Sequence, residues 1–320
     1  MKLLFIFTGG TIGSTASKNG ISPDKEKPYL LLKKYAERYP IDFTYDILSP
    51  MSELSENFSG AHISEILNTV TAHAKGYDGI VVTHGTDTLA YTASALGYAL
   101  GNDTPPVCLV SSAYPLEDER ENGTHNLFGA ISLIRTKKEK GVFVPYQNEC
   151  KESVTIHRAS RLSTSLAFLH QIFSIEDCPY GEVGNAGVFH KNPDFTEAPD
   201  ACPPPPSLTL SERSDRLLRV FPYPGMVYPE IRDETRAILL DTYHSGTVDG
   251  KSPEAHAFLK EANEKRVPVF VTGNAVYESA RIFDEYGVTR LFLSPIAAYM
   301  KLWLYGASTD LSLSRGGDAF

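Results

Sequence analysis

Short, almost continuously apolar segments alternate with amphipathic segments along the first half of the chain, and this alternation limits the folds open to it. The apolar segments are rich in β-branched and aliphatic residues, which predicts strands; they are 3–7, 43–48, 79–83, 107–111 and 142–146. Helical spacing of apolar residues marks the segments between them, which are 28–39, 62–75, 89–100 and 126–138. Strands without a polar face are typical of parallel sheets covered on both sides. The sequence therefore predicts an α/β domain with a doubly wound, mostly parallel sheet.

A second, smaller α/β domain is predicted for the last third of the chain. Periodicity disappears between 192 and 214, where the run Pro203 to Pro206 is typical of a stiff, exposed linker. Beyond it, strands are predicted at 217–221, 237–241 and 267–271, and helices at 253–265, 277–286 and 295–304. We therefore divide the chain into an N-terminal domain of residues 1–191, a linker of residues 192–214 and a C-terminal domain of residues 215–320.

Composition excludes several classes of function. The chain has 320 residues with a net charge of -9 and a pI near 5.5, which argues against nucleic acid as a partner because phosphate binding needs clustered Lys and Arg. No window approaches the ~18 consecutive apolar residues of a membrane span, and the apolar N-terminus is too short for a signal peptide. Cysteine and histidine spacing gives no metal motif. We predict a cytoplasmic protein with no metal, no cofactor and no membrane partner.

Two polar motifs each follow a predicted strand directly. The first is the segment 8–13, Thr-Gly-Gly-Thr-Ile-Gly, whose glycines allow a sharp turn and a close approach to a ligand, although a plain βα turn explains it equally well. The second is the segment 84–88, His-Gly-Thr-Asp-Thr, in which Asp87 or Thr88 could also be an ordinary helix N-cap. In a parallel sheet both motifs would reach the carboxyl edge, where Thr11 and Thr86 could face one pocket.

Taken together, the pair TGGTI and HGTDT resembles the signature of bacterial-type L-asparaginases and glutaminase-asparaginases. The resemblance extends to the segments 55–57, 120–123, 158–161 and 224–225, so it covers both domains. It implies an N-terminal catalytic domain that hydrolyses L-asparagine to L-aspartate and ammonia, with L-glutamine as a slower substrate. It also implies a homodimer or homotetramer, because in this family the site forms between the large domain of one subunit and the small domain of another.

The resemblance also implies the roles of individual residues. Thr11 would be the nucleophile, with Thr86, Asp87 and Arg161 as further catalytic residues. The residues that would bind substrate are Gly10, Ser55, Glu56, Gly85, Thr86, Asp87 and Ser112. The Asp87 carboxylate suits the α-ammonium group, and the Ser55 hydroxyl suits the α-carboxylate. Backbone N–H groups at Thr11 and Thr86 would stabilise the oxyanion.

The sequence departs from the family pattern at four positions. Arg161 replaces a lysine, and an arginine cannot accept a proton near pH 7, so either another residue accepts it or activity is reduced. Ile21 replaces a lid tyrosine, and Tyr29 is either its substitute or a helix anchor. Glu56 replaces a glutamine, and Thr247 lies where relatives carry an asparagine in a glycine-rich turn.

Two alternative functions stay open at this point. One is the amidase subunit of a tRNA-dependent amidotransferase, which shares this catalytic domain but normally carries a further N-terminal domain, whereas here the first strand is predicted from Leu3. The other is a catalytically weak homologue that binds and senses an amino acid, which the residues Ile21 and Arg161 motivate. Turnover separates the enzyme from the sensor.

Overall fold

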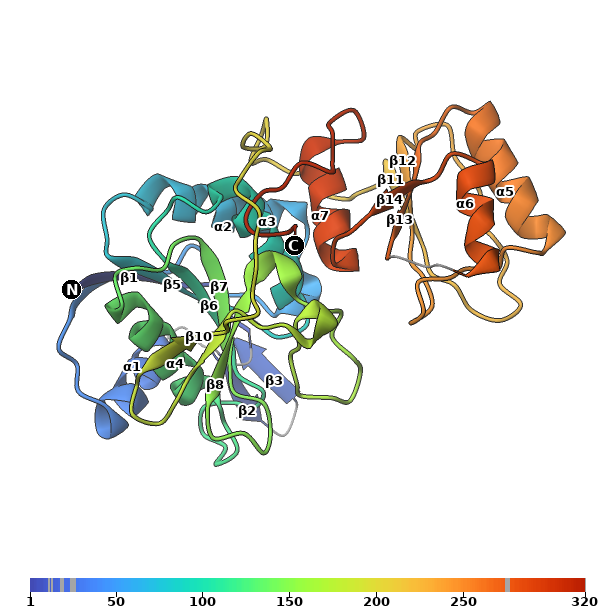
Figure 1. The fold of residues 1–320 in the computed structure, drawn as a ribbon. Coiled ribbons are helices and arrows are strands. Elements are labelled where there is room, and N and C mark those ends of the chain that lie inside the picture. Colours follow the sequence, from blue (N-terminus) through green and yellow to red (C-terminus); the bar gives the residue numbers. More distant parts are fainter. Residues whose placement is uncertain (11, 13, 18–19, 24–26, 274–276, 320) are drawn as a thin grey trace.

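A computed structural model of the chain describes residues 1–10, 12, 14–17, 20–23, 27–273 and 277–319. Two bodies of unequal size lie side by side, and each is built on its own sheet (Figure 1). None of the helices within these ranges is long and apolar enough to cross a membrane.

The large body is built on an eight-stranded sheet of order β10-β9-β8-β7-β6-β5-β1-β4. Five neighbouring strands are parallel: β4 (Thr44–Leu48), β1 (Lys2–Phe7), β5 (Gly79–Thr83), β6 (Val107–Val110) and β7 (Val142–Tyr146). The remaining three are antiparallel: β8 (Val154–Arg158), β9 (Gly181–Val183) and β10 (Phe189–Lys191). The prediction of a mostly parallel sheet is confirmed.

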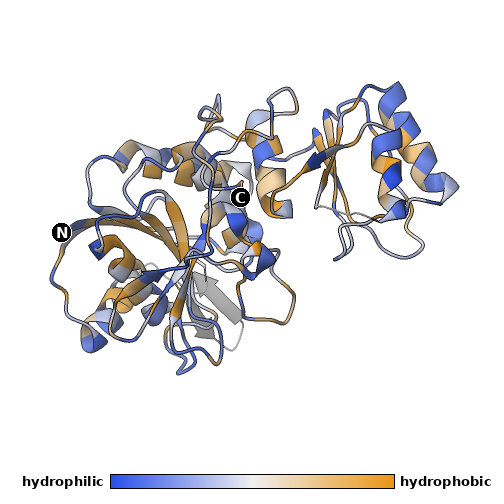
Figure 2. Cartoon of the chain, viewed as in Figure 1, coloured by the Kyte–Doolittle hydropathy of each residue, from blue (hydrophilic) through white to orange (hydrophobic). Residues whose placement is uncertain are grey.

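Helices cover both faces of this sheet, and the central strand β1 shows why. Leu4 and Ile6 of β1 join one core with α2 (Gly60–His73) and α3 (Leu89–Leu100), whereas Leu3, Phe5 and Phe7 join a second core with α1 (Lys27–Arg38) and α4 (Gly123–Arg135). Alternate side chains of a strand point to opposite faces, so an apolar strand needs a cover on each side. The strands are accordingly the most hydrophobic part of the large body (Figure 2).

The small body has a four-stranded parallel sheet, as the predicted second α/β domain requires. Its strands run in the order β11 (Leu217–Val220), β12 (Ala237–Leu240), β13 (Val269–Thr272) and β14 (Thr289–Leu291). Helices α5 (Pro253–Glu264) and α6 (Arg281–Glu285) pack over one face. Helix α7 (Pro295–Tyr305) lies between the small sheet and α3 and so joins the two bodies (Figure 1).

The segment predicted as an exposed linker packs partly against the large body. Phe195, Cys202 and Leu210 are buried, and they are too widely spaced in the sequence to produce a periodic signal. The end of the chain also returns to the large body, where the guanidinium of Arg315 donates to the Tyr98 carbonyl oxygen. The last residues of the chain therefore pack with the large body, and the domain bounds at 191 and 215 stay a prediction.

Other differences concern short elements. The helix predicted at 277–286 is a 3₁₀ turn, Glu278–Ala280, followed by α6. The segment after the first glycine motif contains a hairpin of β2 (Ser14–Ser17) and β3 (Gly20–Pro23) that the sequence did not indicate.

Candidate active site

The two polar motifs meet at one edge of the large sheet because β1 and β5 are parallel neighbours. The segment that follows β4 reaches the same edge, where Glu53 pairs with the first motif. The Gly10 N–H donates to the Glu53 carbonyl oxygen at 2.9 Å, and the Glu53 N–H donates to the Thr8 carbonyl oxygen at 3.1 Å. The order of the sheet also changes direction at β1, since its neighbours β4 and β5 follow it on opposite sides. Ligand sites of open α/β sheets lie at such places.

Close approach of backbones explains the glycines of both motifs. Gly9 and Gly10 have positive φ angles of +105° and +75°. A Cβ atom on Gly10 would lie 2.2 Å from the backbone nitrogen of Gly85, and a Cβ on Gly85 would lie 2.4 Å from the Ser55 hydroxyl oxygen. Side chains larger than hydrogen therefore cannot be accommodated without moving the backbone. The first motif is more than a plain turn, because its glycines let three segments touch.

Ser55 contributes a buried hydroxyl to this contact. Its side chain is 1% exposed, and its Oγ has no hydrogen-bond partner among the residues that the structure describes. Backbone contacts hold the residue in place: the Thr88 hydroxyl donates to the Ser55 carbonyl oxygen at 2.9 Å. Because leaving a buried hydroxyl unpaired costs about 1–3 kcal/mol, this group is suited to bind a polar ligand.

Glu53 fixes the 3₁₀ turn that carries Ser55, a role that no sequence motif indicated. Its carboxylate oxygen Oε1 accepts hydrogen bonds from the Leu54 N–H and from the Asn57 side-chain amide, both at 2.9 Å. These hydrogen bonds lower the pKa of Glu53. The neighbouring residue Glu56, predicted to bind substrate, has an exposed side chain.

Thr86 and Asp87 line a cavity of about 320 Å³ beside this contact. Thr86 is half-buried and Asp87 is exposed. The other residues that line the cavity are Ala113, Tyr146 and the segment 165–172. Asn148 anchors this segment, since its side chain exchanges hydrogen bonds with the backbone of Ile172 at 2.8 Å in both directions. The loop 165–172 thus borders this cavity, and the spacing of residues in the sequence did not indicate that it would.

The remaining residues singled out in the sequence either do not line the cavity beside Thr86 or lie outside the described residues. Thr11, the predicted nucleophile, lies outside the described residues, as does the side chain of Ile21. Ser112 is fully buried just after β6, and its hydroxyl donates to the Tyr114 carbonyl oxygen at 2.6 Å. Tyr29 on α1 is 66% exposed. The turn that contains Thr247 is in the small body and is closed by a hydrogen bond from the Tyr243 N–H to the Thr247 carbonyl oxygen at 2.8 Å.

Arg161, predicted to be a catalytic residue, contacts the segments around residues 196 and 317–319. Its buried guanidinium donates to the carbonyl oxygens of Thr196, Gly317 and Ala319 at 2.6–2.7 Å and lies over the Phe195 ring at 4.3 Å. No hydrogen bond between described residues joins it to Thr86. Its acceptors come from segments far along the chain, so the position of Arg161 in the motif did not reveal where its side chain would bind.

His84 has a structural role, as expected for a histidine at the end of a buried strand. One ring nitrogen contacts the Gly85 carbonyl oxygen at 2.7 Å and the other contacts the Thr92 hydroxyl at 2.8 Å. Burial lowers the pKa of His84 to about 4, so the ring is neutral near pH 7. Both nitrogens are occupied, which leaves neither for a substrate.

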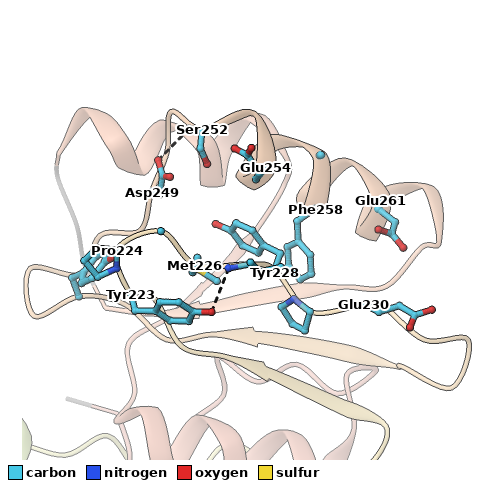
Figure 3. Close-up of a pocket in the computed structure, with 15 residues that line it drawn as sticks. Tyr223, Pro224, Met226, Tyr228, Glu230, Asp249, Ser252, Glu254, Phe258 and Glu261 are labelled. Atoms are coloured by element: carbon cyan, nitrogen blue, oxygen red, sulfur yellow. Dashed lines mark hydrogen bonds between the residues drawn. The ribbon is translucent and has the colours of Figure 1, made fainter.

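A larger cavity, of about 950 Å³, lies in the small body (Figure 3). Carboxylates of Glu230, Glu254 and Glu261 surround it, and Pro224 and Gly225, which belong to the family resemblance, form part of its wall. None of the residues predicted to act on substrate lines it. Size alone therefore does not identify the active site, and the smaller cavity beside Thr86 is the better candidate.

The fold and this edge define an α/β protein with a candidate site for a small polar ligand between glycine-rich turns. Residues 2–194 match the family described as Asparaginase, N-terminal. The chain therefore belongs to the asparaginase family, and its enzyme class is that of the amidohydrolases.

Relatives agree with this assignment. The chain is 28% identical over 266 residues to L-asparaginase 1 of Escherichia coli K12, a match that covers 81% of this chain and 74% of that protein. It is 26% identical over 338 residues to a glutamyl-tRNA(Gln) amidotransferase subunit of Sulfolobus acidocaldarius, covering 97% and 72% respectively. Among solved structures, the thermostable L-asparaginase from Thermococcus kodakarensis superposes with a TM-score of 0.76 at 25% identity, covering 97% of this chain and 94% of that chain.

Proposed function

We propose that this protein hydrolyses L-asparagine to L-aspartate and ammonia through a threonine acyl-enzyme. The observation that carries the proposal is the buried hydroxyl of Ser55, which has no hydrogen-bond partner among the described residues and lies against the backbone of Gly85, next to Thr86 and Asp87. The hydroxyl of Ser55 and the exposed carboxylate of Asp87 suit the two charged groups on the α-carbon of an amino acid. The L-asparaginases among the relatives support asparagine as the substrate.

The reaction would proceed in two steps. The Thr11 hydroxyl oxygen attacks the side-chain amide carbon, its proton passes to the leaving nitrogen, and the C–N bond breaks to release ammonia. Water then attacks the resulting ester, which releases aspartate and restores the hydroxyl. Backbone N–H groups of the two glycine-rich turns would stabilise the negative oxygen in both steps. Asp87 would hold the α-ammonium group.

The role of Arg161 is the part of the mechanism that we revise. Its guanidinium keeps its proton and donates to three backbone carbonyls. We propose that it supports the site by fixing the chain's C-terminal segment, and that another group accepts the proton of Thr11. Thr86 would then act as a bridge between the nucleophile and this acceptor.

We also propose a homodimer or homotetramer in the cytoplasm. Asp87 is exposed in a single chain, whereas a charged group that binds substrate is more effective when water is excluded from it. The turn at Thr247, which would complete a neighbouring subunit's site, is in the small body. Its position agrees with a site shared between subunits.

The test is ammonia release from L-asparagine and L-glutamine by the wild type, Thr11→Ala and Thr86→Val. Thr71→Val, which changes an exposed threonine on α2, is the matched control. We expect Thr11→Ala to reduce kcat by roughly 10³-fold or more, Thr86→Val to reduce it strongly, and Thr71→Val to leave it unchanged. A wild type that releases no more ammonia than Thr11→Ala would refute the proposal; aspartate binding measured on that protein would instead favour the sensing homologue.

The amidase component of a tRNA-dependent amidotransferase is the second candidate, because the match to the Sulfolobus acidocaldarius protein spans 97% of this chain. This function predicts that glutamine is the preferred amide and that its hydrolysis depends on a synthetase-charged tRNA and a partner protein. Efficient asparagine turnover by the isolated protein would exclude it.

A further inference from the structure

A second large cavity, of about 900 Å³, lies between the small sheet, the end of α7 and the segment that connects the two bodies. Its lining includes the residues at the amino ends of β11 and β12. The site of the proposed hydrolysis lies instead at the carboxyl edge of the large sheet, and the two cavities share no lining residue. The lining residues are Ser211, Ser214, Asp215, Arg216, Leu217, Arg236, Ala237, Leu302, Trp303, Gly306, Ala307 and Ser308.

Two adjacent arginines give this cavity a positive side. Arg216 and Arg236 precede the paired residues Leu217 and Ala237, and the Arg236 N–H donates to the Arg216 carbonyl oxygen at 2.7 Å. Both side chains are exposed. Asp215 supplies the only carboxylate among the lining residues, although the whole chain carries a net charge of -9. The two guanidinium groups thus form a positively charged patch on a protein whose net charge is negative.

The two arginines differ in how they are held. The Arg236 guanidinium donates to the carbonyl oxygens of Asp233 and Thr235 at 2.7 and 3.1 Å, which limits its movement. The Arg216 guanidinium makes no hydrogen bond or ion pair with any residue that the structure describes. One fixed and one unpaired guanidinium suit an anion with several oxygens, because arginine binds phosphates and carboxylates through parallel hydrogen bonds.

Trp303 supplies an aromatic wall to the same cavity. Its indole N–H donates to the Ser211 hydroxyl at 3.1 Å, and its ring makes an edge contact with Tyr299 at 5.7 Å between centroids. These two contacts fix the orientation of a half-buried ring. A fixed indole beside two guanidinium groups can hold a flat ring and an attached anion together.

We propose that this cavity binds a small organic phosphate that carries a planar ring, with the phosphate at Arg216 and Arg236 and the ring at Trp303. The carbonyl end of α7, next to Gly306, attracts cations rather than anions, so the phosphate lies on the arginine side. The ligand would touch the connecting segment, the small sheet and α7, which itself packs on α3. Its binding would therefore hold the small body against the large one.

Trp303 is the only tryptophan in the chain, so tryptophan fluorescence reports on the surroundings of this one cavity-lining side chain. We would titrate the purified full chain with adenosine monophosphate, adenosine and inorganic phosphate. We expect adenosine monophosphate to cause a saturable change in fluorescence. At the same concentrations, adenosine alone and inorganic phosphate alone should cause a much smaller change. The affinity should fall as salt is added, because the contact is between exposed charges. This readout does not depend on amidase activity.

Arg216→Gln is the main variant, because the Arg216 guanidinium has no described partner whose loss would disturb the fold. This variant should lower the affinity for adenosine monophosphate by about tenfold or more, which is a typical loss when a charge-assisted hydrogen bond is removed. Arg236→Lys should weaken it as well, because lysine cannot bind two oxygens in parallel. Arg281→Gln, an exposed arginine on α6 outside the cavity, is the matched control and should bind like the wild type.

Three outcomes would overturn the proposal. One is the absence of a saturable change with adenosine monophosphate. The second is an affinity for adenosine monophosphate that is unchanged in both arginine variants, because the arginines would then not bind the phosphate. The third is inorganic phosphate binding as tightly as adenosine monophosphate, because the planar ring would then contribute nothing to the affinity.

Discussion

Replacing Gly10 by alanine tests whether close backbone approach, rather than turn conformation alone, builds the active site. The new Cβ would lie 2.2 Å from the Gly85 nitrogen, where real Cβ contacts essentially never fall below 3.0 Å. A left-handed conformation costs a non-glycine residue about 1–2 kcal/mol, and overpacking of this kind costs about 1–3 kcal/mol more. We therefore expect Gly10→Ala to lower the free energy of unfolding by about 2–5 kcal/mol.

Two other glycines provide controls for the conformational part alone. Gly225 and Gly306 have nearly the same φ angles, +72° and +71°, but a Cβ on either would meet nothing within 4 Å. Gly225→Ala and Gly306→Ala should therefore cost about 1–2 kcal/mol each. Urea denaturation followed by circular dichroism measures all three variants against the wild type. The reasoning is refuted if Gly10→Ala costs no more than the controls.

The same variant connects stability with catalysis. To relieve the contact, the first motif and Gly85 must separate by most of an ångström, which moves the neighbouring residue Thr86 relative to the first turn. Misplacement of about 1 Å can reduce the rate on the order of 10²-fold. Under conditions where Gly10→Ala is fully folded, kcat on L-asparagine should fall by about this factor, whereas Gly225→Ala should retain activity.

Three further predictions concern buried polar groups. Burial lowers the pKa of His84 from 6.5 to about 4, so between these pH values the unfolded chain binds a proton that the folded chain does not. The free energy of unfolding should therefore fall as the pH decreases through this window, by about 3 kcal/mol from this residue, and urea titrations of His84→Gln should show a shallower dependence. The ion pair of Lys301 with Asp318 is almost fully buried at 2.7 Å, so Asp318→Asn should cost about 3–5 kcal/mol, measured by urea denaturation beside the charge control Asp310→Asn. Arg161→Lys should lower stability by about 1–3 kcal/mol without raising kcat, because one ammonium cannot reproduce the reach of a guanidinium to three carbonyls; a variant with increased kcat would restore the catalytic interpretation of this position.

The sequence predicted the parallel part of the large sheet because β1, β5, β6 and β7 are almost completely buried and therefore apolar, while the exposed edge strand β4 still carries the apolar residues Ile47 and Leu48. Strands β8, β9 and β10 were missed: β8 is buried but contains the polar residues Thr155, His157 and Arg158, whereas β9 and β10 have three residues each and carry exposed polar groups such as Glu182 and His190. Strands that are short or rich in polar residues give little hydrophobic signal. The partly buried connecting segment was missed for a related reason, because its anchors Phe195, Cys202 and Leu210 have no regular spacing.

The candidate site was predictable where it depends on topology and not where it depends on distant contacts. Parallel neighbours end at the same edge, so the sequence alone could bring the two motifs together. The direction of the Arg161 side chain depends on carbonyl groups 156 and 158 residues further along the chain, at Gly317 and Ala319. Glu53 was also missed, because its role rests on hydrogen bonds to its own neighbours rather than on a motif.

Besides α7, a largely buried ion pair of the small body also contacts the large body. Arg219 on β11 forms a bidentate ion pair with Asp241 at 2.6 and 3.0 Å, and it donates to the Tyr91 hydroxyl on α3 at 3.0 Å. Asp241 follows β12 directly and precedes the turn that ends at Thr247. The same guanidinium therefore binds a residue shortly before this turn and a residue of the large body. If Thr247 completes the site of a neighbouring subunit, its placement depends on an ion pair that lies inside its own chain.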